Sequence, residues 1–306
     1  MTISPPTIAE PAPIAVAPEL PELFSEAETR RSRFAAITRD PATSIGLALL
    51  SVLVLTAIFA PFLATHHPNE LDPTARLRAP SAGNWFGSDM LGRDIYSRVV
   101  YGARVSLAVG LCVAIASTFF GFVFGLISGF IRWTDGPIMR LMDGLMSIPS
   151  ILLAITLITL FEPNIFNVIL AITIAEIPRT SRLVRSAVLS LREQPFVDAA
   201  ITAGTRTPMI IIRHILPNTL GPVTVQATYV CASAMIIESV LSFIGAGLPP
   251  SVPSWGNILA EGRALWLVKP YIIFFPAVFL SITVLAVNLL GDGLRDRLDP
   301  YSNRDI

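Results

Sequence analysis

The chain has 306 residues, of which 53% are hydrophobic and only 14% are charged, and its formal net charge is zero. Soluble domains carry about 25% charged residues, so this composition excludes an ordinary water-soluble protein and predicts a membrane protein whose surroundings are lipid. The zero net charge says little about other partners, and no nucleic acid is expected among them.

Residues 1–40 are rich in proline and glutamate and lack helical periodicity, which predicts a disordered tail. They contain no basic region followed by a short apolar core, so no secretory signal peptide is expected. The later boundaries are predicted as a first transmembrane helix at 41–67, an external segment at 68–103, a five-helix core at 104–292 with a cytoplasmic loop at 191–218, and a C-terminal tail at 293–306.

Six apolar segments are long enough to cross a hydrocarbon layer of ~30 Å, which takes about 20 helical residues. They are 44–64, 105–130, 138–160, 166–190, 219–243 and 272–291. The fourth is the least regular because Pro178 and three arginines fall in its second half, so its lipid-embedded part is expected to end near Ile177. The sequence therefore predicts an all-α membrane protein with six transmembrane helices.

The distribution of basic residues predicts the orientation of these spans. With the N-terminus inside, 15 of the 22 lysines and arginines lie on the cytoplasmic side. Cytoplasmic loops carry the excess of positive charge in membrane proteins. Both termini are therefore expected in the cytoplasm.

The second span carries Gly121, Gly125 and Gly129 on one helical face. Small residues at a spacing of four let two helix backbones approach closely. This row predicts a packing seam, either within the bundle or against a partner.

The cytoplasmic loop contains the stretch DAAITAGTRTPMIIIRHILPN, residues 198–218, which is interrupted too often to span a bilayer. Pro195 suits the first position of a helix, and Gly204 suits the position just past its end. The helix between them is too short to be stable alone, so it must dock against something. Its alanines offer a surface that another protein can approach closely; the alternative is a loop that merely connects two spans.

This stretch resembles the cytoplasmic loop of ABC-importer membrane subunits, whose pattern is E-A-A-x3-G-x9-I-x-L-P. The match runs through Asp198-Ala199-Ala200, Gly204 and Leu216-Pro217. It departs from the pattern at two positions, where aspartate replaces glutamate at 198 and His214 stands in place of isoleucine.

Four further stretches resemble the dipeptide and oligopeptide importer permeases, and most of all the second of that family's two permease subunits. They are WFGSDMLGRDIYSRVVYGARVSL (85–107), EIPRTSRLVRSAVLSLREQ (176–194), ESVLSFIGAGLPPSVPSWGNILAEGR (238–263) and NLLGDGLRDRLDP (288–300). The resemblance covers roughly residues 40–300 and leaves out the N-terminal tail.

The resemblance implies a type I importer-like permease in the bacterial inner membrane. Its expected partners are a second, related permease, two ABC ATPase subunits and an external peptide-binding protein. It also implies that the short cytoplasmic helix couples the permease to an ATPase. The residues assigned to this coupling are Asp198, Ala199, Ala200, Gly204 and Arg206.

The resemblance implies that ATP and Mg²⁺ are used by partner subunits, and the residues of this chain indicate that it binds no such cofactor itself. A nucleotide-binding P-loop needs the lysine of G-x-x-x-x-G-K-[ST]. The only lysine, Lys269, stands in WLVKPY. No catalytic triad, metal-ligand cluster or catalytic pair of carboxylates is recognised either, so the chain is not expected to be an enzyme.

Carboxylates within apolar spans are costly and are often functional. Glu238 is a candidate for lining the transport pathway, and the alternative is a carboxylate that is hydrogen-bonded to neighbouring helices. Asp143 and Glu176 are better explained by ion pairs with Arg140 and Arg179, respectively.

Residues near the outer ends of the spans are candidates for external contacts. Asp89, Arg93 and Asp94 are expected to fix an external helix and to meet the binding protein. Trp255 is expected either to anchor at the membrane interface or to belong to an ordered outer loop.

Other readings stay open at this point. Nickel, or a nickel complex, is an alternative cargo for the same architecture, although no intramembrane His/Cys/Met cluster indicates metal handling. An ion-driven secondary transporter would need a midplane ion site and internal repeats, which are not recognised. A scaffold without transport activity would leave the capped cytoplasmic helix unexplained.

Overall fold

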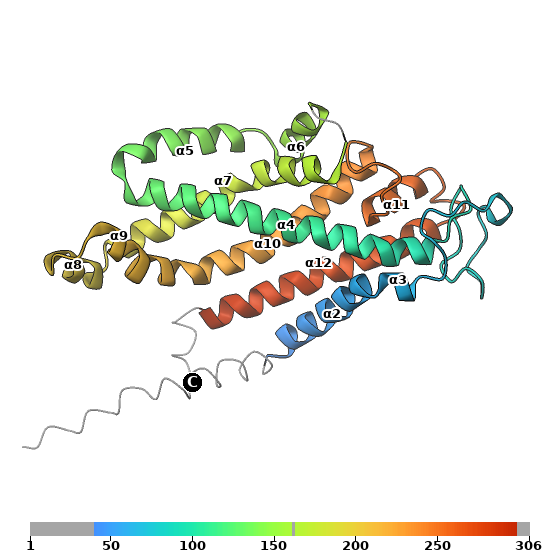
Figure 1. Cartoon of the computed structure of the whole chain (residues 1–306), viewed down its shortest axis with the longest axis horizontal. Helices are drawn as coiled ribbons and strands as arrows, with labels where there is room; N and C mark the ends of the chain where they lie inside the picture. Colours follow the sequence, from blue (N-terminus) through green and yellow to red (C-terminus); the bar gives the residue numbers. More distant parts are fainter. Residues whose placement is uncertain (1–39, 161–162, 299–306) are drawn as a thin grey trace, which may run out of the picture. The chain divides into compact units, whose positions relative to one another are not determined.

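The computed structural model describes residues 40–160 and 163–298, and within them the regular elements are helices apart from one isolated bridge between Ser88 and Asp94. The expected N-terminal tail before residue 40 lies outside the described residues, as does the chain beyond residue 298. In chain order the elements are α2 (Pro41–Ile58), α3 (Ala60–Leu63), the 3₁₀ turn η1 (Pro73–Ala75), α4 (Ile95–Phe130), α5 (Arg132–Met146), α6 (Ser150–Thr159), α7 (Ile165–Arg192), α8 (Pro195–Thr202), α9 (Thr207–Ile210), the π-helical turn η2 (Ile211–Ile215), α10 (Leu216–Ile244), α11 (Trp255–Gly262) and α12 (Tyr271–Leu298) (Figure 1).

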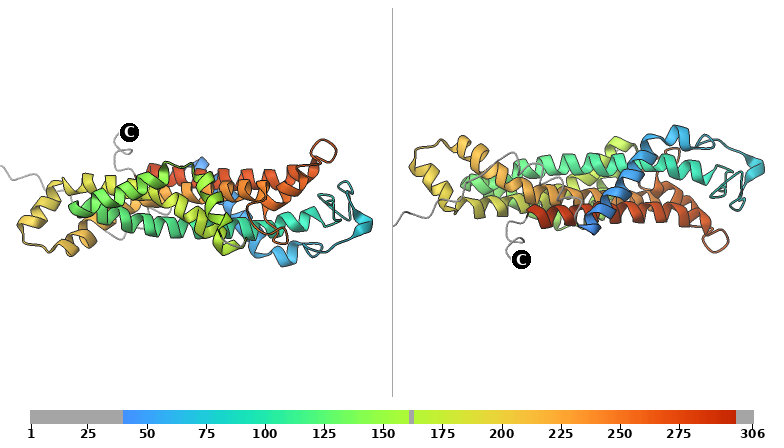
Figure 2. Two further views of the ribbon diagram at one scale, coloured as in Figure 1. Left: turned by 90° about the horizontal axis from the view of Figure 1, so that it is seen from above. Right: turned by 90° about the horizontal axis from the view of Figure 1, so that it is seen from below.

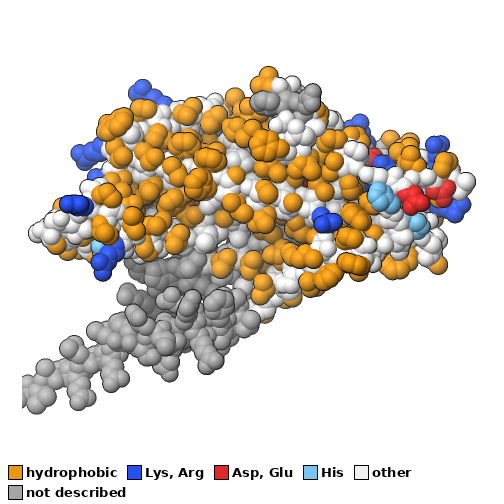
Figure 3. All heavy atoms as spheres, in the orientation of Figure 1, with side chains coloured by type: hydrophobic (Ala, Val, Ile, Leu, Met, Phe, Trp, Pro, Cys, Tyr) orange, Lys and Arg blue, Asp and Glu red, His pale blue; other side chains and the backbone are white. Residues whose placement is uncertain are grey.

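Four helical segments in the described residues are long and apolar enough to cross a membrane, and the bent pair α5 and α6 would make a fifth. The four are α2, α4, the continuous run of α9, η2 and α10, and the part of α12 up to Asp296. The axes of α5 and α6 meet at 88°. Apolar side chains cover most of the face of the bundle seen in Figure 3, where basic side chains lie mainly near both ends and acidic side chains are visible near one end.

Helix α7 corresponds to the fourth span expected from the sequence, but it does not qualify as apolar enough. It has 28 residues, and its second half carries the arginines noted above. The structure therefore supplies four spans, or five with the bent pair, among the described residues. The number six stays a prediction.

Local signals set where the helices begin and end. The Asp40 carboxylate accepts a hydrogen bond from the Thr43 backbone N–H at 2.9 Å, and α2 starts directly after it with a proline. Asp94 caps α4 in the same way through the Ser97 N–H at 2.8 Å. Such side chains satisfy backbone donors that have no partner within the helix.

The glycine seam predicted on the second span is confirmed, and its partner is α7 of the same chain. A Cβ atom at Gly121 would lie 2.6 Å from the Thr180 Cβ, and one at Gly125 would lie 2.6 Å from the Val184 Cβ. A Cβ at Gly129 would lie 2.8 Å from the Val188 Cβ. Contacts this short would force the helices apart, so only glycine permits the observed approach.

The remaining helices complete the bundle on the other side of α4. Helix α10 packs against α4, α7 and α12, and α2 lies obliquely across α12 and α4 (Figure 2). One core cluster joins α4, α6, α7 and α10 around residues such as Val113, Ile172 and Ala234. A second cluster surrounds Trp255 at the end of the bundle that carries α11 (Figure 1).

Candidate functional site

The short helix predicted between Pro195 and Gly204 is present as α8, at the end of the bundle opposite α11 (Figure 1). Pro195 occupies its first turn, where a missing N–H costs nothing. Asp198 also lies in the first turn, where the helix dipole favours a negative charge. The local sequence therefore specifies this helix.

Gly204 ends α8 in the left-handed conformation, with φ at +76°. The Thr205 N–H donates to the Ala200 carbonyl at 3.0 Å, which is the bond that closes a Schellman motif. A Cβ at Gly204 would meet nothing within 4 Å. The requirement for glycine here is therefore conformational and does not come from crowding.

Helix α8 docks on its own chain through one edge. Val197 is only 2% exposed and belongs to a core cluster with residues of α7, α9, η2 and α10. Ala200 is half-buried against the same cluster. Of the three alanines expected to face a partner, Ala200 therefore faces partly inward, whereas Ala199 and Ala203 are exposed together with Asp198.

The opposite side of this segment presents large apolar side chains to the outside. Phe196 is 41% exposed, Ile201 57%, Met209 52% and Ile212 61%. The arginines at 206 and 213 are exposed beside them. An exposed apolar surface framed by charge is typical of a contact site for another protein.

The helix that precedes α8 is tied to α5 by ion pairs. Arg185 of α7 donates from Nε and Nη2 to the two carboxylate oxygens of Asp135 in α5, at 2.5 and 2.6 Å. Arg182 pairs with Asp143, which corrects the expected partner Arg140. The expected pair between Arg179 and Glu176 is present, at 3.6 Å. These ion pairs balance the positive charges of the three arginines that interrupt the apolar character of α7.

Glu238 does not line an open pathway in this structure. Its side chain is fully buried and accepts hydrogen bonds from the hydroxyls of Ser242 and Ser254, each at 2.9 Å. Ser254 in turn caps α11 through the Asn257 N–H at 3.2 Å. The structure thus shows the hydrogen-bonded alternative, in which Glu238 holds the start of α11 against α10, and a role in the transport pathway stays a prediction.

The expected external contacts of Asp89, Arg93 and Asp94 also need correction, because all three side chains are buried within the chain. Asp94 is used as the cap of α4. Arg93 binds Asp89 at 2.7 Å and Glu261 of α11 at 2.7 Å. The buried side chains fix the segment that precedes α4, and a contact of this segment with a binding protein stays a prediction.

Two members of this buried network escaped the sequence analysis. Arg98 is completely buried in α4 and donates to Asp89 at 2.7 Å and to Glu261 Oε1 at 3.0 Å. Arg98 and Glu261 are 163 positions apart, so no local spacing indicates that they pair. We call Asp89, Arg93, Arg98 and Glu261 the outer ion cluster.

Trp255 is likewise buried and does not anchor at a surface. Its exposed fraction is 0%, and its indole N–H donates to the Val99 carbonyl at 3.0 Å. It belongs to the ordered outer structure, which was the second of the two expectations.

In the described residues, no group of three or more histidine, cysteine or acidic side chains could hold a metal ion. The surface around α8 is thus the one predicted site that the structure leaves open to a partner, whereas the outer ion cluster and Glu238 are internal.

Known proteins with similar sequences share most of the chain. Residues 102–303 match the binding-protein-dependent transport system inner membrane component family, and residues 34–80 match the N-terminal TM domain of oligopeptide transport permease C. A probable peptide ABC transporter permease protein of Sinorhizobium fredii is 51% identical over 87% of this chain and 91% of that protein. The dipeptide transport system permease protein DppC of Alkalihalophilus pseudofirmus is 40% identical over 95% of each chain.

The fold is similar to that of a chain in the inward-facing MetNI methionine ABC transporter. The TM-score is 0.57 at 19% identity, covering 66% of this chain and 96% of that chain. This similarity concerns the fold alone. The match over residues 102–303, about two thirds of the chain, shows that the chain belongs to the family of binding-protein-dependent transport system inner membrane components.

Proposed function

We propose that the chain is a permease subunit of an ATP-driven importer of dipeptides or oligopeptides. The observation that carries the cargo class is the set of relatives at 37–51% identity over most of the chain, whose names refer to peptide, dipeptide or oligopeptide transport. In this proposal the protein crosses the inner membrane six times, with α7 as the fourth span. Both termini are cytoplasmic.

The proposed assembly contains this chain, a second related permease, two ABC ATPase subunits and an external peptide-binding protein. ATP and Mg²⁺ bind to the ATPases, because the lone lysine of this chain cannot form a P-loop. This subunit contributes the pathway and no catalytic residue.

We assign α8 as the element that couples ATP use to transport. Its Val197 edge packs in a core cluster with residues of α7 and α9, whereas Phe196 and Ile201 face outward. A short helix held in a cleft of an ATPase would move with that cleft. Because α8 packs on α7 and on α9, which continues into α10, such a movement would reach the bundle. ATP binding can then shift the equilibrium between two permease states by its differential affinity for them.

Asp198, Ala199 and Ala203 form the polar and small part of the proposed contact, and Arg206 flanks it. Gly204 supports it by ending the helix at the observed angle. Ala200 acts from the inner side, through its packing on the core cluster.

Cysteine crosslinking in the complete assembly tests this assignment. Ala199→Cys, on the exposed side of α8, should crosslink to an ATPase subunit. Ala82→Cys is the matched control, since this exposed alanine belongs to the external segment and should not react with the ATPases. Absence of any ATPase crosslink from position 199 contradicts the coupling role.

A substitution at the helix end provides a functional test. Gly204→Asp places a side chain in a left-handed conformation that costs about 1–2 kcal/mol locally, and transport should be lost while the ATPase subunits still bind nucleotide. Gly83→Asp, which also has open space around it, should leave transport unchanged. Normal uptake by the Gly204→Asp assembly would count against the assignment.

The cargo is tested in proteoliposomes that contain the whole assembly with its binding protein. Uptake of a labelled dipeptide that exceeds uptake of ⁶³Ni²⁺ supports the peptide assignment. If only nickel is taken up, the cargo is nickel and the peptide assignment is wrong. Uptake that is driven by a proton gradient without ATP overturns the whole proposal.

A further inference from the structure

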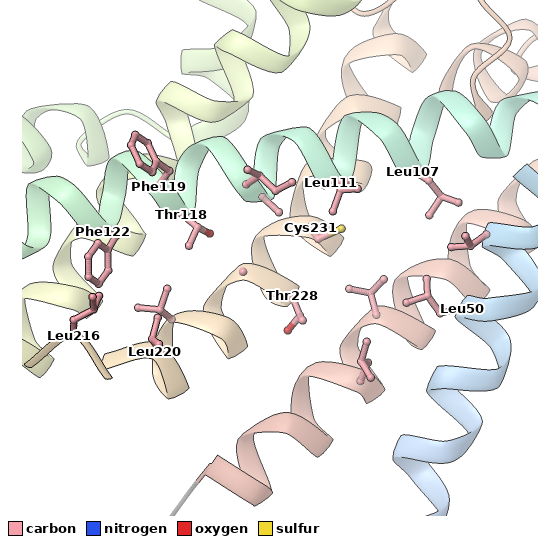
Figure 4. A pocket seen from close by; sticks show the side chains of 17 residues that line it. Leu50, Leu107, Leu111, Thr118, Phe119, Phe122, Leu216, Leu220, Thr228 and Cys231 are labelled. Carbon is pink, nitrogen blue, oxygen red and sulfur yellow. The ribbon is translucent and has the colours of Figure 1, made fainter. Parts of the chain in front are cut away.

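An apolar groove of about 630 Å³ runs along α4 and is lined by side chains of α2, α4, α10 and α12 (Figure 4). On α4 its lining extends from Leu107 to Phe122. At 1.5 Å per residue this corresponds to about 23 Å of helix. The only hydroxyls in the lining belong to Thr118 and Thr228, and the Thr228 hydroxyl already donates to the Val225 carbonyl at 2.8 Å. The groove therefore suits a hydrocarbon occupant.

A second hollow of about 340 Å³ continues the groove toward the α11 end of the bundle. The two hollows share Val54, Leu107 and Leu111 in their linings. The second hollow is also lined by Arg104, which is exposed. Arg104 lies nine residues, or about 14 Å, past the start of α4.

Arg104 has no hydrogen bond and no ion pair with any residue in the described part of the chain. By contrast, Arg98, which is buried six residues earlier in α4, has ion pairs with both Asp89 and Glu261 of the outer ion cluster. An arginine without a counter-ion at the edge of an apolar groove is costly in a membrane and marks a site for an anionic group. Guanidinium groups bind phosphate oxygens with two parallel hydrogen bonds.

The size of the groove distinguishes between candidate occupants. A methylene group takes up about as much room as the ~30 Å³ of one liquid water, so the groove holds roughly 20 methylenes, the scale of one fatty acyl chain. A peptide is excluded by chemistry, since its backbone polar groups would find almost no partners along this wall.

We propose that this groove binds one phospholipid, with an acyl chain along α4 and the headgroup phosphate on Arg104. The lipid would fill the space between α2 and the rest of the bundle, which the protein's own side chains leave open. With Arg104 near the end that carries the external segment, the lipid belongs to the outer leaflet of the membrane.

Lipid binding to the purified assembly tests the proposal. The full-length chain with its partner subunits is delipidated in detergent and titrated with phosphatidylglycerol, and bound lipids are counted by native mass spectrometry. One lipid should bind more tightly than the rest, and Arg104→Gln should weaken that binding at least tenfold. Arg76→Gln is the matched control, because Arg76 is exposed in the external segment and lines neither hollow.

Further probes separate the parts of the site. Phosphatidylcholine should also bind, whereas diacylglycerol, which lacks a phosphate, and inorganic phosphate, which lacks a chain, should not. Ala227→Phe adds a ring to the wall of the groove and should lower lipid binding without loss of Arg104. If this variant fails to fold, the exposed Arg104 substitution still decides the question.

Three results would overturn the proposal. The first is phospholipid binding by Arg104→Gln that is as tight as that of the unaltered protein. The second is binding of diacylglycerol that is as tight as that of phosphatidylglycerol. The third is a crosslink from Leu111→Cys to the second permease in most molecules, which would mean that a protein helix occupies the groove.

Discussion

Replacing Arg98 by methionine tests how the outer end of the bundle is held together. Arg98 is completely buried, and it shares Asp89 and Glu261 with Arg93. After Arg98→Met, one arginine faces two carboxylates. Removing one partner of a buried ion pair costs about 3–5 kcal/mol. The Glu261 side chain is 21% exposed and partly solvated, so we expect the lower limit, about 3 kcal/mol.

The assay follows from that magnitude. The entropy of unfolding is about 2.1 cal/mol/K per residue, so for this chain of 306 residues a loss of about 3 kcal/mol should lower the melting temperature of purified Arg98→Met by roughly 5 °C. Hydrogen exchange should increase most in α11 and in residues 86–94, which the outer ion cluster connects. Exchange in α8, at the other end, should not change.

Two variants make the result interpretable. Arg182→Met is the matched control, because the Arg182 and Asp143 side chains are 46% and 58% exposed and such pairs contribute about 0.2–1 kcal/mol. The double variant Arg98→Met/Glu261→Gln should recover part of the loss, since Asp89 and Arg93 then balance each other. The reasoning is refuted if Arg98→Met has the same melting temperature as the unaltered protein, or if Arg182→Met lowers the melting temperature by as much as Arg98→Met does.

Three further predictions concern other parts of the chain. Gly125→Val should lower the melting temperature through overpacking that costs about 1–3 kcal/mol. Gly144→Val, whose Cβ would have no atom within 4 Å, should have a melting temperature close to that of the unaltered protein, and equal effects of the two variants would contradict the close packing of α4 on α7. Ser254→Ala should cost about 1–2 kcal/mol, because it removes a helix cap and a hydrogen-bond donor to Glu238, and unchanged hydrogen exchange in α11 would argue against that role. Ile201→Glu, on the exposed face of α8, should leave the melting temperature unchanged but reduce co-purification of the ATPase subunits, and undiminished recovery of the ATPases would speak against the proposed contact.

Some features of the structure could be predicted because their signals are local. Proline at the start of α8 and Gly204 at its end specify a helix through backbone geometry alone. The glycine row on α4 predicted close packing through a spacing of four residues, although not the identity of its partner, α7. In each case the information lies within a few turns of one helix.

Other features depend on contacts between distant residues and could not be predicted in this way. Arg98 and Glu261 meet only because α11 folds back onto the start of α4. Glu238 is hydrogen-bonded by Ser254, which is 16 residues away across a loop. Asp143 finds Arg182 on a neighbouring helix although Arg140 is closer in sequence. Sequence reasoning thus found the local pair of Glu176 with Arg179, three residues away, but not the distant partners of Glu238, Asp143 and Arg98.

Helix α4 has one further consequence for how such a protein must work. It runs for 36 residues without a proline, about 54 Å, from the outer ion cluster to the glycine seam with α7. The same continuous rod thus touches both the part that leads into α8 and the part that holds α11. A rigid displacement of α4 along its axis would therefore move both of these parts together.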